Sequence, residues 1–350
     1  MISKIDILSL GYQQLERELE ELGCKAFRAK QVYQWLHVKL VDSFDNMTNL
    51  PNDLRHILKE KFVLSTLTLI KRLESKDDGT VKFLFGLDDG NIIEGVLMSY
   101  RHGSSVCISS QVGCRMGCKF CASTIGGLKR NLSVGEMLSQ VYCIQRLAGV
   151  RVRNVVVMGT GEPLDNYDNF VAFVRMITDQ YGLNISGRNI TASTCGMVPK
   201  ILKLADEKLQ ITLALSLHGA TQDKRETLMP IARKYPLTDV LDACKIYYEK
   251  TKRRITLEYN LIAGVNDTDD DANDLISLLA NSNYHLNLIP YNVVAGYNFQ
   301  RPEQKIVANF KNKLEKNGIN VTIRREMGGD INGACGQLRR GILNEEVFLE

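Results

Sequence analysis

Three cysteines in one short segment are the residues of this chain best suited to hold a metal. Cys114, Cys118 and Cys121 have the spacing C-x-x-x-C-x-x-C within VCISSQVGCRMGCKFCASTIGG, residues 106–127. Soft thiolates favour zinc or an iron–sulfur cluster. A structural zinc site takes four ligands, and the sequence contains no second CxxC or HxxxH pair to complete one. A four-iron cluster with three cysteine ligands instead leaves one iron open to a small molecule.

The segment around these cysteines is polar, which argues against a role in packing alone. Cysteines that only pack behave as small apolar residues, whereas here Arg115, Lys119 and neighbouring glycines form a polar loop. The amino and carboxylate groups of a methionine moiety, as in S-adenosylmethionine, would suit the open iron. We therefore expect a [4Fe-4S] cluster whose open iron binds a small molecule of this kind.

Strand-like runs alternate with helical segments after residue 106, which indicates an α/β fold with a parallel sheet. The runs are VCISS, VRNVVVMG, RNITAS, ITLALSLH, RITLEYN, LNLIP and NVTIR. Six or so such units are too many for a small open sheet and too few for an eight-fold barrel. They predict a partial (β/α)6 TIM-type barrel. The cysteine segment, GTGEP, STCG and SLHG each follow a strand, so we expect them along one rim.

Four regions are predicted along the chain. Residues 9–62 have helical periodicity, and we expect residues 1–62 to form a helical accessory domain that binds RNA. Residues 63–99 predict a small β region, with Asp-Asp-Gly turns at 77–79 and 88–90. The barrel is expected over residues 100–335, followed by a tail over 336–350.

Composition is typical of a globular protein of 350 residues, with 44% apolar residues and a net charge of +4. No run of 18 apolar residues and no apolar signal-peptide core is present, so we expect a cytoplasmic protein with no membrane partner. In that reducing compartment nine cysteines indicate metal binding or catalysis more than a disulfide framework. A monomer is expected.

The motifs CISSQVGCRMGCKFCAS, MGTGEPLDNYDN, STCGMVP, LSLH, MPI and DINGACGQL together resemble the RlmN family of the radical S-adenosylmethionine superfamily. The resemblance covers nearly the whole chain. It implies methylation of adenosine carbon 2 in 23S rRNA, at the peptidyl-transferase centre, and beside the anticodon of some tRNAs. The related Cfr type, which methylates carbon 8, usually has Ala where this chain has Pro163. Thr160, Asn332 and Gly333 depart from the usual RlmN pattern.

The resemblance also implies a mechanism with two S-adenosylmethionine molecules per turnover, one cluster per chain and an external electron donor such as flavodoxin or ferredoxin. Cys335 is methylated first, as a thiolate nucleophile. A 5′-deoxyadenosyl radical then removes a hydrogen from that methyl group, and the resulting methylene radical adds to carbon 2. Glu94 matches the proton acceptor. Cys107 matches the resolving thiol that attacks Cys335 and leaves a transient disulfide.

The family's contacts to S-adenosylmethionine carry over to seven positions at successive strand ends. Glycine lets the backbone approach the ligand, and the carboxylate pairs with the methionine ammonium. The histidine has a binding role only. The positions are Gly161, Glu162, Ser193, Ser216, Leu217, His218 and Asn292. Of the other cysteines, Cys24, Cys143, Cys195 and Cys244 are expected to pack, with Cys195 nearest the site.

On the residues alone, three of these assignments have simpler readings: Cys335 as a free terminal cysteine, Cys107 as an inward strand residue and Glu94 as a surface carboxylate.

Basic segments at 27–39, 128–131, 252–254, 324–326 and 339–340 fit phosphate contacts to a structured RNA. Besides the Cfr type, a non-catalytic metal-binding protein that binds RNA is the alternative. Zinc without acid-labile sulfide would favour it.

Overall fold

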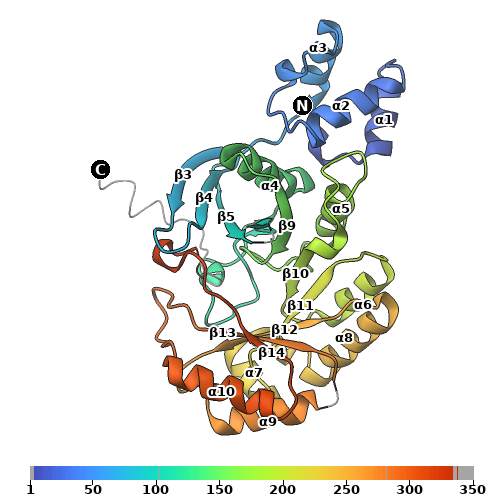
Figure 1. The fold of residues 1–350 in the computed structure, drawn as a ribbon. Helices are drawn as coiled ribbons and strands as arrows, with labels where there is room; N and C mark the ends of the chain where they lie inside the picture. The colour runs from blue at the N-terminus through green and yellow to red at the C-terminus, as the bar shows by residue number, and fades with distance from the viewer. Residues whose placement is uncertain (1–3, 102, 281, 334–336, 338–350) are drawn as a thin grey trace.

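The computed structural model of the protein describes residues 4–101, 103–280, 282–333 and 337, and its main feature is a ten-stranded sheet. Seven neighbouring strands of this sheet run parallel in chain order. They are β6 (Gly103–Cys107), β9 (Val152–Val157), β10 (Ile190–Thr194), β11 (Thr212–Ser216), β12 (Thr256–Leu261), β13 (His285–Pro290) and β14 (Val321–Ile323). Figure 1 shows the strands curving around an open barrel with helices outside. The predicted partial α/β barrel is confirmed.

Helices join the parallel strands. They are α4 (Val134–Ala148), α5 (Tyr167–Ile177), α6 (Val198–Asp206), α7 (Gln222–Leu228), α8 (Leu237–Thr251), α9 (Asp269–Leu279) and α10 (Gln304–Lys316). The ends of α4 show how the sequence sets these elements. Ser133 caps its first turn reciprocally with Glu136, and Gly149 ends it with a φ of 65°.

Three antiparallel strands extend the same sheet beyond β6. They are β3 (Thr68–Glu74), β4 (Val81–Gly86) and β5 (Ile92–Tyr100), which pair β3 with β4, β4 with β5 and β5 with β6. The Asp-Asp-Gly segments form the turns between them, as the hairpin pattern predicts. Residues 68–100 therefore continue the wall of the barrel.

The N-terminal segment forms three helices beside α4 and α5 (Figure 1). They are α1 (Tyr12–Glu21), α2 (Phe27–His37) and α3 (Asn52–Lys61), with a short parallel pair of β1 (Ile5–Asp6) and β2 (Phe62–Val63). Leu15 and Leu19 of α1 and Val32 and Leu36 of α2 are buried, as their helical spacing predicts. This segment shares its apolar core with the barrel.

A buried histidine lies where α2 meets α4. His37 has no exposed surface, its Nδ1 lies 2.8 Å from the Tyr142 hydroxyl, and its ring centroid lies 4.2 Å from that of Tyr33 in a tilted contact. Burial lowers the pKa of His37 to about 3. The ring is therefore neutral at physiological pH, and protonating it would place an uncompensated charge between the two domains.

We expect this histidine to make the protein less stable in mild acid. Its folded pKa lies below the unfolded value of about 6.5, so the stability it contributes is present above that value and is lost as pH falls toward 3. The loss between pH 8 and pH 5 is about 2 kcal/mol for this group. Urea unfolding of His37→Gln should show a decline over that range that is shallower by this amount. His56→Gln, which changes an exposed histidine, should follow the wild type.

Candidate active site

The three cysteines lie on a loop that leaves the carboxyl end of β6. The loop is closed at its base by two short antiparallel strands, β7 (Gln111–Val112) and β8 (Arg130–Asn131). Gly113 allows the two arms to cross, because a Cβ there would lie 1.9 Å from the Gly127 carbonyl oxygen. Only glycine fits this position, which also has a φ of 77°.

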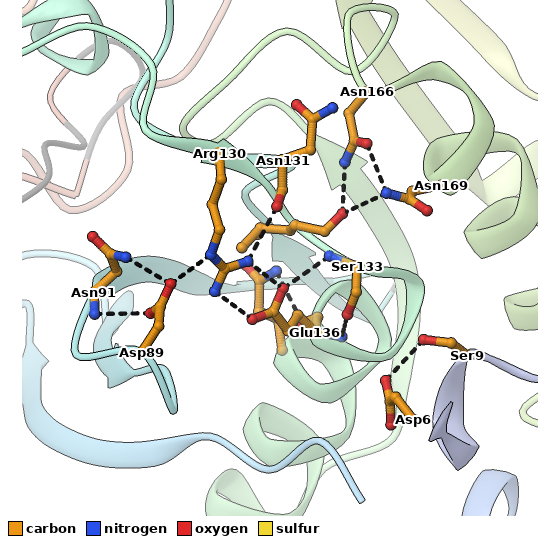
Figure 2. A network of polar contacts seen from close by, with 12 residues as sticks. Asp6, Ser9, Asp89, Asn91, Arg130, Asn131, Ser133, Glu136, Asn166 and Asn169 are labelled. Atoms are coloured by element: carbon orange, nitrogen blue, oxygen red, sulfur yellow. Dashed lines mark hydrogen bonds and ion pairs between the residues drawn. The ribbon is translucent and has the colours of Figure 1, made fainter. Parts of the chain in front are cut away.

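Arg130 anchors the second arm of the loop (Figure 2). Its Nε donates to Asp89 at 2.5 Å, and its two terminal nitrogens donate to Glu136 at 2.7 and 2.8 Å. Glu136 also accepts from the Ser133 backbone N–H at 2.8 Å (Figure 2). Arg130 belongs to a basic segment expected to contact RNA, but its guanidinium is engaged in fixing the loop to β5's preceding turn and to α4.

The segment after β9 holds the loop from the other side. Asn166 donates to the carbonyl oxygens of Ser110 at 2.9 Å and Leu132 at 2.8 Å. The buried carboxylate of Asp165 accepts from Arg115 Nε at 2.9 Å and from its Nη2 at 2.5 Å. The motif MGTGEPLDNYDN therefore forms part of the rim and also holds the cysteine loop in place.

Cys114, Cys118 and Cys121 line one cavity within the barrel mouth. Desolvation raises the pKa of Cys114 to about 12 and holds the pKa of Cys118 well above its ordinary value. The negative charge of the neighbouring thiolates raises both further. These thiols therefore stay protonated at neutral pH unless a metal displaces their protons.

The donor set fits an iron–sulfur cluster. Within the described ranges, no three His, Cys, Asp or Glu side chains gather as the ligands of one metal ion would. Each thiolate ligand of a four-iron cube binds a different iron, so such a cluster does not require the sulfurs to meet at one point. Three soft thiols around a shared cavity are the ligands that iron–sulfur clusters take.

Glu162 lies on the rim of this cavity and is buried. Its Oε2 accepts from the Cys195 backbone N–H at 2.8 Å and its Oε1 from that of Leu164 at 3.1 Å. Burial raises the pKa of this carboxyl, and the two backbone donors lower it. The carboxylate is held rigidly and can pair with an ammonium group in the cavity.

Gly161 has two reasons to be glycine. It lines the cavity, as expected for close approach of the backbone to a ligand. It also has a φ of 112°, and a Cβ there would lie 2.7 Å from both Ser110 Oγ and Gln111 Cβ. Glycine is therefore also required for the loop after β9 to pack against the loop after β6.

Ser193 near the end of β10, Ser216 at the end of β11 and His218 just after it line the same cavity. The two serine hydroxyls lie 3.2 Å apart. His218 Nδ1 accepts from the Asn260 backbone N–H at 2.9 Å, and burial lowers the pKa of this ring to about 3. The ring is therefore neutral with its proton on Nε2, which suits a hydrogen-bond donor and not a general acid near pH 7.

The residues Leu217 and Asn292, which are also expected to contact the cofactor, are not among those that line this cavity. The Leu217 side chain is fully buried in the barrel core, so this residue offers a ligand only its backbone. Asn292 lines a second cavity next to the first. Met158, Ile289 and Arg324 line both cavities and form the boundary between them.

The second cavity contains Cys107, which is buried at the end of β6. Gly333, two residues before Cys335 in the sequence, lines the same cavity. Cys335 itself lies outside the described residues, as does the tail over 336–350 except residue 337. The cavity with the cluster cysteines and the cavity with Cys107 thus meet at shared walls.

Glu94 is only 1% exposed and forms an ion pair with Lys82 at 2.9 Å. Its reading as a surface carboxylate is therefore wrong. The sequence offers one indication of the buried Lys82: it is the only charged residue in the apolar run TVKFLFGL. A lysine in such a run is expected to point inward only if both faces of the strand are buried.

Arg225 is a second buried cation that the sequence did not reveal. Its side chain is fully buried, and its Nη2 donates to the Cys195 carbonyl oxygen at 2.5 Å. Burial lowers the pKa of this guanidinium, and the charges of Cys195 and Cys118 raise it. Within the described part of the chain it has no carboxylate partner, so it favours negative charge on the nearby sulfurs. Its surroundings in the sequence, QDKRETL, are those of a surface helix.

The remaining cysteines pack as expected. Cys143 and Cys244 lie in the main core, and Cys24 packs against it. Cys195 lines the first cavity, next to the cluster cysteines. None of the described helices is long and apolar enough to cross a membrane.

Comparison with known proteins agrees with this arrangement. Residues 108–279 match the Radical SAM superfamily, and residues 5–64 match the ribosomal RNA large subunit methyltransferase N-terminal domain. A relative from Lachnoclostridium phytofermentans, named as a probable dual-specificity RNA methyltransferase RlmN, is 58% identical over 99% of this chain and 98% of its own length. A relative of the same name from Lachnospira eligens is 56% identical over 97% of each chain.

A solved structure has the same fold. The crystal structure of a radical SAM methyltransferase from Sphaerobacter thermophilus superposes with a TM-score of 0.92 and 42% identity, covering 96% of this chain and 99% of that one. The near-complete coverage includes both the N-terminal helices and the barrel. This chain belongs to the RlmN family of dual-specificity RNA methyltransferases within the radical SAM superfamily.

Proposed function

We propose that this RNA methyltransferase places a methyl group on carbon 2 of adenosine, in 23S rRNA and in some tRNAs, through a methyl group carried on Cys335. The observation that supports this most is the contact between the two cavities. One holds the three cluster thiols, and the other holds Cys107 and Gly333, close in sequence to Cys335. A group activated in the first cavity has a short path to a thiol-borne methyl group in the second.

The residues of the first cavity bind and orient the cofactors. Membership of the superfamily implies a [4Fe-4S] cluster and S-adenosylmethionine, and we assign one cluster per chain and two S-adenosylmethionine molecules per turnover. When bound, these groups supply the 5′-deoxyadenosyl radical. Cys114, Cys118 and Cys121 hold the cluster. The cofactor contacts are Gly161, Glu162, Ser193, Ser216, the Leu217 backbone, His218 and Asn292.

The protein's thiols carry the methyl group. The Cys335 thiolate takes a methyl group from one S-adenosylmethionine, which leaves as S-adenosylhomocysteine. The S-methyl group loses one hydrogen atom to the radical, and its carbon bonds to carbon 2. One electron leaves the ring for the electron carrier, and Glu94 accepts the ring proton.

Release of the product requires the second thiol. The Cys107 thiolate attacks the Cys335 sulfur, and the sulfur–carbon bond breaks with its electron pair on carbon. That carbon takes up one proton to become the methyl group of the product. An external reductant returns two electrons to the Cys107–Cys335 disulfide.

We assign residues 1–62 to RNA positioning, residues 63–99 to the wall of the barrel beside Glu94, and residues 100–335 to the chemistry. Lys39 lies 3.5 Å above the Trp35 ring on the N-terminal module, which combines charge and an aromatic face on one surface. We expect a monomer that receives electrons from a flavodoxin or ferredoxin and works in the cytoplasm.

The position of the new methyl group tests the proposal. Anaerobic reaction with a 23S rRNA fragment and with tRNA, followed by nuclease digestion and mass spectrometry against both isomers, should give 2-methyladenosine. A predominantly 8-methyl product would show that the Cfr-type reading is correct. Pro163, the residue that separates the two motifs, lines neither cavity, and its carbonyl oxygen accepts from the Asn166 backbone N–H at 3.1 Å. Pro163→Ala is therefore expected to retain carbon 2 selectivity.

A further inference from the structure

A buried lysine joins Glu94 to the segment that precedes Cys335. Lys82 Nζ lies 2.9 Å from Glu94 Oε1 and donates to the Asn332 carbonyl oxygen at 3.2 Å. The side chains of Lys82 and Glu94 are 2% and 1% exposed. Two charges so deeply buried require close partners, because an unpaired charge in the interior is strongly unfavourable.

The pair lies on the face of the sheet that carries Cys107. Lys82 is directly opposite Val96 in the β4–β5 ladder, and Val96 is directly opposite Cys107 in the β5–β6 ladder. Residues directly opposite each other project to the same face, as do residues two apart on one strand, such as Glu94 and Val96. Lys82, Glu94 and the resolving thiol therefore share one face of the sheet.

The β3–β4 hairpin also holds the segment before Cys335 through its turn. The Gly328 backbone N–H donates to Asp78 Oδ2 at 2.9 Å, and the Lys76 backbone N–H donates to Asp330 Oδ2 at 3.1 Å. Asn332, which receives the Lys82 bond, has a φ of 50° and ends a short helical turn. Lys82 thus supplies the innermost of three contacts that fix this segment.

We propose that Lys82 is a positioning residue for the methyl transfer: its ammonium, anchored on the Asn332 carbonyl oxygen, pairs with Glu94 and fixes that carboxylate in place. This inference rests on the proposed role of Glu94 as the proton acceptor. A neighbouring ammonium favours the ionised form of a carboxylate, and only the ionised form can accept the ring proton. Lys82 lies outside residues 108–279, the part of the chain that matches the radical SAM superfamily.

Four variants test the inference in single-turnover reactions with cluster-loaded enzyme and RNA. The measurements are 5′-deoxyadenosine formation and the rate at which the covalent protein–RNA adduct resolves on a denaturing gel. Lys82→Met and Glu94→Gln should each form 5′-deoxyadenosine normally but resolve the adduct about 100-fold more slowly, the scale of general base catalysis. Lys71→Met, which changes a lysine on the neighbouring strand β3, should match the wild type.

The double variant separates positioning from packing. If Lys82 acts through Glu94, the variant Lys82→Met/Glu94→Gln should resolve the adduct no more slowly than Glu94→Gln alone. This double variant should also fold, because it removes both buried charges together and leaves neither unpaired. Additive slowing would overturn the inference, as would wild-type resolution by Lys82→Met beside a slow Glu94→Gln. Wild-type resolution by Glu94→Gln would instead remove Glu94 from the proposed function.

Discussion

Cys107→Ala is expected to accumulate as a covalent complex with its RNA. Without the resolving thiol, the enzyme still accepts a methyl group on Cys335 and still forms the carbon–carbon bond to adenine, but nothing breaks the sulfur–carbon bond. The complex should survive denaturation and disappear on nuclease treatment. The measurement is a denaturing gel of the cluster-loaded variant after reaction, before and after nuclease.

Two further variants serve as comparisons for Cys107→Ala. Cys335→Ala should abolish RNA methylation with its cluster loaded and without any adduct. Cys143→Ala, a buried cysteine in the main core away from both cavities, is the packing control. The Cys143→Ala substitution should lower the free energy of unfolding by about 1–3 kcal/mol and reduce activity only in proportion to the loss of folded protein. Absence of a nuclease-sensitive adduct in Cys107→Ala, with residual methylation by Cys335→Ala, would rule out the methyl-cysteine mechanism.

Cys118→Ala is expected to lose the iron–sulfur cluster and with it all cleavage of S-adenosylmethionine, a loss of at least about 100-fold. Removing one of three protein ligands leaves a second iron without a thiolate. Cys195→Ala is the matched control, because Cys195 is buried in the same cavity but stands outside the motif. The measurement is the iron, zinc and acid-labile sulfide content of both variants.

Full cluster content and cofactor cleavage in Cys118→Ala would contradict the assignment of the ligands. Zinc with no acid-labile sulfide in the wild type would support the non-catalytic alternative. The raised pKa of Cys114 and Cys118 adds a further expectation: cluster assembly should release protons, since the free thiols are protonated at neutral pH.

The strands and their rim were predictable because their signals are local. Each of the seven predicted runs overlaps a parallel strand, although β6 ends at Cys107 within the run VCISS, and the motifs at the ends of β6, β9, β10 and β11 meet at one cavity. Parallel strands separated by helices leave few other topologies. The continuity of β3–β5 with the barrel was not predictable, because antiparallel hairpins can pair with a sheet or stand apart.

Charged side chains that join distant segments were the main features that the sequence did not reveal. Arg130, Arg225 and Lys82 all occur among residues typical of surfaces or ordinary strands, and only the pairing of distant segments shows what they hold. Asp89 is 41 positions from Arg130, and Asn332 is 250 positions from Lys82. The motif names Leu217 as a cofactor contact without saying which of its atoms takes part, and the structure shows that its side chain packs in the core, so only its backbone can face a ligand.

The most direct test of the methyl-cysteine account follows the hydrogens of the transferred methyl group. Enzyme whose Cys335 has been methylated with a trideuteromethyl group is reacted with RNA and unlabelled S-adenosylmethionine for one turnover. The account predicts a product methyl group with two deuterium atoms and one proton from solvent, and 5′-deoxyadenosine with one deuterium. A product that retains all three deuterium atoms would show direct transfer of an intact methyl group and would contradict the account.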